Sequence, residues 1–157
     1  MKIYNIPNLG KCEIHNILLD LNGTLTQFGK YPTDLRSLIQ EMKKFFEIYV
    51  ISANTRGTLD QIADDLGIKA IHIPKSKSEK ESKLTSLRVL NSDQTIAIGN
   101  GNNDIEIITQ SKIGIAVLGN EGVSIQSMIS ADLVVPSISD ALKILLDEKA
   151  LIATLRK

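Results

Sequence analysis

Short apolar runs alternate with amphipathic segments along most of this chain, and this alternation restricts the folds it can adopt. The runs are continuously apolar instead of alternating with polar residues, which is typical of strands that are covered on both faces. They lie at about 17–19, 48–52, 70–73, 95–98, 113–118 and 133–135, and helical patterns lie between them at about 33–46, 58–67, 79–90, 104–110, 122–130 and 139–146. The sequence therefore predicts an α/β fold, a three-layer sandwich around a mainly parallel, Rossmann-type sheet with right-handed crossovers.

The length of the chain is that of one domain. It has 157 residues, and no connection between the expected elements is long enough for a second folded unit. We expect a single domain over 1–157, with an N-terminal hairpin at about 1–16, a core at about 17–147 and a short C-terminal tail.

The composition argues against several classes of partner. Eighteen basic and 18 acidic residues give a formal net charge of zero, so we expect neither nucleic acid nor an anionic membrane. Aromatic residues make up only 4% of the chain, too few for a stacking platform for single strands. The chain has one cysteine, no apolar run of membrane-spanning length and no signal-peptide pattern. We expect a cytoplasmic protein without disulfides.

Polar residues follow three of the predicted strands, where a parallel sheet binds its ligands. These strands end in Asp-Leu-Asn-Gly-Thr at 20–24, in Ser52-Ala53-Asn54, and in Gly-Asn-Gly-Asn-Asn-Asp at 99–104. Neighbouring strands would bring carboxylates, amides, a hydroxyl and glycine-rich turns into one crevice, and Lys80 could add a positive charge. Such a set favours phosphoryl chemistry, with Asp20 as nucleophile and Mg²⁺ as the cation.

Each of these residues also has an ordinary structural interpretation. An aspartate after a strand often makes a turn, and a serine there often satisfies local backbone groups. Lys80 lies in a charged run at 75–83, which is typical of a solvated surface. The ordered set is more specific than any of its members.

The order and spacing of these motifs resemble the haloacid dehalogenase (HAD) superfamily of phosphotransferases, from about residue 17 to about 146. The first motif is matched by ILLDLNGT at 17–24, the second by the serine that ends YVIS at 49–52, and the fourth by GNGNND at 99–104. Within the superfamily, the chain looks most like soluble single-domain relatives of the P-type ATPase phosphorylation domain. Those ATPases place the third-motif lysine seven residues before a helical leucine, and Leu87 then selects Lys80.

The resemblance implies a role for each matched residue. Asp20 would attack the phosphoryl group and become an aspartyl-phosphate, while Lys80 would neutralise the carboxylate and the phosphate. Phosphoryl oxygens would be bound by Ser52, Ala53, Gly23 and Lys80, and Mg²⁺ by Asp20, the Asn22 carbonyl, Asn100 and Asp104.

Two amides stand where phosphatases of this superfamily carry aspartate. The residue two after the nucleophile usually donates a proton to the leaving group and then activates water. Here it is Asn22, which cannot exchange a proton at neutral pH. Asn100 replaces the first aspartate of the fourth motif and offers Mg²⁺ less charge. We therefore expect slow turnover.

The connections at 26–46 and 54–80 leave no room for a cap domain, so we expect an open site or one covered in a homo-oligomer. The function expected is that of a Mg²⁺-dependent phosphohydrolase or phosphotransferase, acting on a phosphorylated small molecule or a phosphoprotein. Two alternatives remain: a phosphate- or nucleotide-binding regulatory protein without turnover, and a structural subunit of an oligomer. The retained Asp20, Ser52 and Lys80 favour the enzyme, whereas Asn22 and Asn100 favour the regulatory protein.

Overall fold

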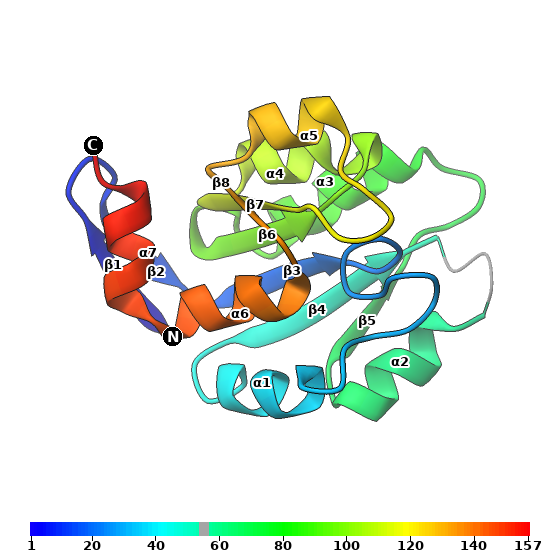
Figure 1. Ribbon diagram of the computed structural model, residues 1–157. Helices are drawn as coiled ribbons and strands as arrows, with labels where there is room; N and C mark the ends of the chain where they lie inside the picture. The colour runs from blue at the N-terminus through cyan, green and yellow to red at the C-terminus, as the bar shows by residue number, and fades with distance from the viewer. Residues whose placement is uncertain (54–56) are drawn as a thin grey trace.

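The computed structural model describes residues 1–53 and 57–157, and its centre is a six-stranded parallel sheet (Figure 1). The strand order is β5-β4-β3-β6-β7-β8, and all neighbours in it run parallel. The strands are β3 (Asn16–Asp20), β4 (Glu47–Ser52), β5 (Lys69–His72), β6 (Thr95–Gly99), β7 (Ile113–Val117) and β8 (Leu133–Val135). Asn54, predicted among the polar residues that follow β4, lies outside the described residues.

Helices cover both faces of this sheet (Figure 1). One face packs against α1 (Leu35–Met42), α2 (Leu59–Leu66) and α6 (Ile138–Leu146). The other carries α3 (Glu79–Val89), α4 (Ile105–Gln110) and α5 (Ile125–Ser130), with single turns η1 (Ser92–Gln94) and η2 (Asn102–Asp104). The predicted three-layer α/β sandwich is confirmed.

The central strand β3 directs alternate side chains to the two helix layers. Ile17 and Leu19 are buried in the core that includes α1, α2 and α6. Leu18 belongs to the smaller core on the other face, together with Leu87 of α3. Asp20 lies two residues after Leu18, so its carboxylate points toward the layer that contains α3.

The N-terminal residues form the antiparallel hairpin of β1 (Lys2–Ile6) and β2 (Gly10–Ile14), where the sequence predicts one. The chain ends in α7 (Glu148–Leu155), which packs against β1, so the two termini lie at the same end of the molecule (Figure 1). The segment expected as a short C-terminal tail is thus a helix that packs on the hairpin. Leu151 is buried, and the side chain of Asp147 accepts a hydrogen bond from the Ala150 N–H at 3.1 Å, which caps the helix.

The described ranges contain no folded unit inserted as a cap. Residues 21–34 form a short flap between β3 and α1, held down by the buried side chains of Leu21 and Leu25. No helix in the described part of the chain has the length and hydrophobicity needed to cross a membrane.

Lys2 ties the hairpin to the end of α6. Its ammonium donates to the carbonyls of Leu145 at 2.8 Å and Leu146 at 2.9 Å, and it lies over the rings of Tyr4 and Phe45 at 5.3 and 5.4 Å. These carbonyls are at the negative end of the helix dipole, where a cation is stabilising.

We expect Lys2→Met to lower the free energy of unfolding by about 1 kcal/mol, because it removes both hydrogen bonds but keeps much of the apolar stem. The matched control is Lys11→Met in the same hairpin, since Lys11 contacts Glu13 on an exposed surface and should contribute little. Urea unfolding measures both variants. Equal losses in the two would contradict a capping role for Lys2.

Candidate active site

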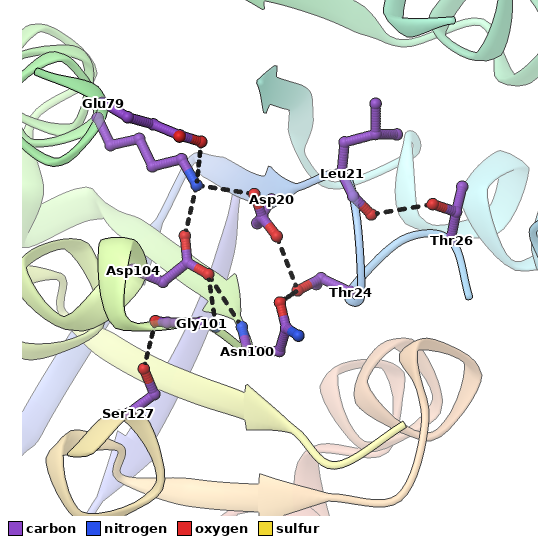
Figure 2. A network of polar contacts seen from close by, with 10 residues as sticks. Asp20, Leu21, Thr24, Thr26, Glu79, Asn100, Gly101, Asp104 and Ser127 are labelled. Carbon is purple, nitrogen blue, oxygen red and sulfur yellow. Dashed lines mark hydrogen bonds and ion pairs between the residues drawn. The ribbon is translucent and has the colours of Figure 1, made fainter. Parts of the chain in front are cut away.

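A buried lysine, Lys83, joins three carboxylates at the carboxyl ends of the central strands (Figure 2). Its ammonium has no exposed surface and donates to Asp20 Oδ1 and to Asp104 Oδ1, each at 2.7 Å. Glu79 Oε1 lies 3.5 Å from the same nitrogen, one helical turn earlier in α3. Because Asp20 ends β3 and Asp104 ends η2, this one ammonium connects the central strand, the fourth-motif turn and α3.

Lys80 does not contact Asp20. Its side chain is half exposed, and its ammonium lies 3.1 Å from Glu106 Oε1 of α4. The expectation that Lys80 pairs with Asp20 is therefore wrong, and Lys83 takes that place. Lys83 lies one turn before the buried Leu87, on the same face of α3. The seven-residue spacing identifies this face of the helix but points one turn too early.

Burial and neighbouring charges both shift the pKa values of Asp20 and Lys83. Burial, together with the nearby Asp104 carboxylate, raises the pKa of Asp20 to about 7. Burial disfavours the charged form of Lys83, yet the carboxylates of Asp20 and Asp104 hold its pKa above the usual lysine value. Lys83 thus stays cationic, and Asp20 is ionised more readily when a further cation lies beside it.

The carboxylate of Asp104 contacts both Lys83 and the turn after β6. It is fully buried, with one oxygen on Lys83 and the other accepting the backbone N–H groups of Asn100 and Gly101, both at 3.0 Å. It is not among the described residues that line the cavity. Asp104 therefore positions Lys83 and the turn after β6.

The amide of Asn100 has a fixed orientation. Its Nδ2 donates to the Gly122 carbonyl at 3.1 Å, which turns Oδ1 toward the flap. There the Thr24 hydroxyl bridges Asn100 Oδ1 at 3.1 Å and Asp20 Oδ2 at 3.3 Å. Gly23 has φ +81°, and a Cβ there would come within 2.2 Å of Asn100 Nδ2, so this close approach requires glycine.

The flap is held by a reciprocal pair of hydrogen bonds. Gln27 Oε1 accepts from the Glu121 N–H, and Glu121 Oε2 accepts from the Phe28 N–H, both at 2.7 Å. Gln27 Nε2 also donates to the Gly23 carbonyl at 2.7 Å. The flap is therefore joined to the loop after β7, the loop whose Gly122 holds Asn100.

These side chains surround a cavity of about 320 Å³, lined by Asp20, Asn22, Ser52, Ala53, Glu79, Asn100, Gly101 and Asn103. Five of the predicted residues thus meet at one cavity, Gly23 and Asp104 lie behind it, and Lys80 lies elsewhere. Lys83 and Glu79 are not predicted from the sequence, and Thr24 is expected in the crevice without an assigned role. The signal for Lys83 was its spacing of four residues from Leu87, which places both on one helix face.

Comparisons with known proteins find one matching family and one similar protein sequence. A family model of haloacid dehalogenase-like hydrolases matches residues 70–140. An uncharacterised protein of Methanocaldococcus jannaschii is 45% identical over 83 residues, which are 50% of this chain and 89% of that protein.

Solved structures share the fold. The 3-deoxy-D-manno-octulosonate 8-phosphate phosphatase of Moraxella catarrhalis, in complex with magnesium, phosphate and KDO, has a TM-score of 0.72 at 19% identity and covers 92% of this chain and 95% of its own. The cobalt-bound phosphatase of Haemophilus influenzae has a TM-score of 0.72 at 18% identity, with 92% and 94% covered. A putative HAD superfamily hydrolase of Legionella pneumophila has a TM-score of 0.68 at 22% identity, with 90% and 88% covered.

The domain thus combines a parallel, Rossmann-like sheet with an aspartate that ends its central strand and is ion-paired to a buried lysine. Residues 70–140 match the haloacid dehalogenase-like hydrolases, and the domain as a whole shares the fold of the solved phosphatases.

The Lys83 ammonium should be the most costly charge to remove from this domain. We expect Lys83→Met to lower the free energy of unfolding at pH 7 by about 3–5 kcal/mol, because it leaves buried carboxylates without a partner. Lys80→Met, three residues away, should cost less than about 1 kcal/mol, since it breaks only an exposed pair. Denaturant titration of both variants checks this, and similar costs would contradict the assignment of Lys83.

The raised pKa of Asp20 predicts a pH-dependent stability in the absence of divalent cations. The neutral carboxyl is favoured in the folded state, so the contribution of Asp20 is greatest below the unfolded pKa of about 4 and is lost as the pH rises to about 7. Asp20→Asn should remove this loss, which is on the order of 2–4 kcal/mol. Urea unfolding in chelator at several pH values tests it, with exposed Asp60→Asn as control. A pH slope that survives Asp20→Asn would contradict the prediction.

Proposed function

We propose that this chain is a Mg²⁺-dependent phosphohydrolase that forms an aspartyl-phosphate at Asp20. The observation that carries the proposal is the pairing of Asp20 with Lys83 at the floor of a polar cavity. The structural neighbours named as octulosonate 8-phosphate phosphatases, with magnesium or cobalt bound, support a metal-dependent phosphatase that acts on a phosphorylated small molecule.

The donor atoms at the cavity fit a hard divalent cation. Asp20 Oδ2 accepts a long, 3.3 Å hydrogen bond from Thr24, and Asn100 Oδ1 faces it across the same hydroxyl. Three carboxylates around one ammonium leave a formal charge of −2, which a divalent cation would neutralise. Mg²⁺ is bound by few carboxylates together with carbonyls, water and substrate phosphate, so this set suits it.

We assign the metal ligands to Asp20, the main-chain carbonyl of Asn22 and the side-chain oxygen of Asn100, with Asp104 acting through Lys83 and the turn. The described residues contain no cluster of three or more His, Cys, Asp or Glu side chains that could hold a metal ion. Modest affinity that improves with phosphate is therefore expected. Mg²⁺ would supply charge neutralisation on the phosphoryl group.

The chemical steps follow from the positions of the side chains. Asp20 attacks phosphorus, the bond from phosphorus to the ester oxygen breaks, and the leaving oxygen departs as an anion that takes its proton from water. Lys83 stabilises the charge on Asp20 and on the phosphoryl group, while Ser52 and the Ala53 backbone bind phosphoryl oxygens. Water then attacks the aspartyl-phosphate and releases inorganic phosphate.

Asn22 lines the cavity at the place where a general acid and base is expected. Its amide can orient a water but cannot accept a proton from it. The second step should therefore be slow, and the phosphoenzyme should accumulate. This same observation supports the second candidate function, a regulatory protein that binds phosphate without turnover.

The replacement Asn22→Asp tests the proposal. We expect it to raise steady-state turnover of p-nitrophenyl phosphate with Mg²⁺ by up to about 10²–10⁴-fold, the usual contribution of a positioned base. Asn103→Asp is the matched control, because it adds a carboxylate to the same cavity without placing it at the second residue after Asp20. Acid-quenched wild type should contain a covalent phosphate that Asp20→Asn lacks.

Two results would count against the proposal. If an Asn22→Asp variant folds normally and shows no gain in turnover, the missing base is not the cause of slow turnover. If wild type and Asn22→Asp both matched Asp20→Asn in turnover and in covalent phosphate, the regulatory function would be the better one.

A further inference from the structure

The charged residues that line the cavity are all acidic in the part of the chain that the structure describes. Asp20 is the expected nucleophile and Glu79 is the second carboxylate. Among the described residues, the Lys83 ammonium contacts both of these carboxylates, and its side chain has no exposed surface. The other lysine of α3, Lys80, lies three residues earlier and is paired with Glu106. These described walls therefore offer a substrate no cationic side chain beyond Lys83.

The carboxylate of Glu79 is less closely paired with Lys83 than the two other carboxylates are. Lys83 lies 2.7 Å from Asp20 and from Asp104 but 3.5 Å from Glu79, so its charge is shared first with the two buried partners. The side chain of Glu79 is 37% exposed, whereas that of Asp20 is 8% exposed. Glu79 is thus the more exposed of the two carboxylates, and it lies on the same Lys83 ammonium as Asp20 (Figure 2).

A phosphate ester bound with its phosphorus at Asp20 must direct the rest of the molecule toward solvent. Because Glu79 lines the same cavity, a leaving group on its side of the cavity would meet its charge at short range. The attraction or repulsion between unit charges a few ångströms apart at a protein surface is large enough to change relative rates several-fold. A carboxylate in this position would therefore distinguish leaving groups by their charge.

We propose that Glu79 is a specificity-determining residue, which favours phosphate monoesters with a neutral or cationic leaving group and disfavours those with a second anionic group, such as phosphorylated sugar acids. The inference rests on the proposed function. It is distinct from a role of Glu79 in orienting Lys83, because that role would affect all esters alike.

Three phosphate esters of similar shape separate these roles: 4-carboxyphenyl, 4-carbamoylphenyl and 4-(aminomethyl)phenyl phosphate. Glu79→Gln should raise kcat/KM for the carboxyl ester relative to the carbamoyl ester by about three- to tenfold, and lower the relative value for the aminomethyl ester by a similar factor. High salt should shrink both differences.

The matched control is Glu81→Gln. Glu81 lies two residues further along α3 and lines a neighbouring groove with His72 and Ser86 instead of this cavity. The relative values for the three esters should not change in this variant, although it removes the same charge from the same helix.

A second measurement does not depend on turnover. The corresponding carboxyphenyl and carbamoylphenyl phosphonates, which cannot be hydrolysed, are titrated by calorimetry with Mg²⁺ into wild type and Glu79→Gln. The carboxyl compound should gain about three- to tenfold in affinity relative to the carbamoyl compound in the variant.

The outcomes distinguish the two proposals. If Glu79→Gln leaves both the ester ratios and the phosphonate ratio unchanged, the specificity role is overturned while the phosphohydrolase proposal stands. If wild type hydrolyses no ester better than Asp20→Asn, the phosphohydrolase proposal fails. The phosphonate ratio then still decides whether Glu79 selects ligands by charge.

Discussion

The shared ammonium of Lys83 is the interaction on which the rest of this site depends. It lies between the carboxylates of Asp20 and Asp104, and all three groups are buried. Burying charges is costly unless each has a partner at close range, so the central strand, the turn after β6 and the start of α3 are held together in one arrangement. The same contacts place the Asp20 carboxylate, the proposed nucleophile, beside a cation.

Two amides, Asn22 and Asn100, stand in this site at positions where an aspartate would add negative charge. Asn100 orients its oxygen toward Asp20 because its nitrogen is held by the Gly122 carbonyl, a contact that an aspartate could not make. Asn22 lines the cavity where a general base would act. Among the described residues that line the cavity, Asp20 and Glu79 carry the charged side chains. The proposed selection against anionic leaving groups rests on the outer of these two carboxylates, Glu79.

The structural neighbours share this fold at 19% identity or thereabouts, and such a likeness does not transfer a substrate. The flap is short, and the described ranges contain no cap, so the leaving group would be contacted mainly by residues of the cavity rim. The nearer resemblance to P-type ATPase phosphorylation domains, the homo-oligomer and the Mg²⁺ ligands stay predictions.

The sequence by itself determined the fold class, the hairpin and the strand-end residues Asp20, Ser52 and Asn100, because hydrophobic periodicity and strand ends are local properties of a chain. Only the tertiary structure decided that Lys83, and not Lys80, meets Asp20, and that Glu79 lies at the cavity. Both lysines belong to one charged segment, and their spacing identifies a helix face. Which turn of that face reaches the sheet is set by how α3 packs on its neighbours, through contacts between residues far apart in the chain.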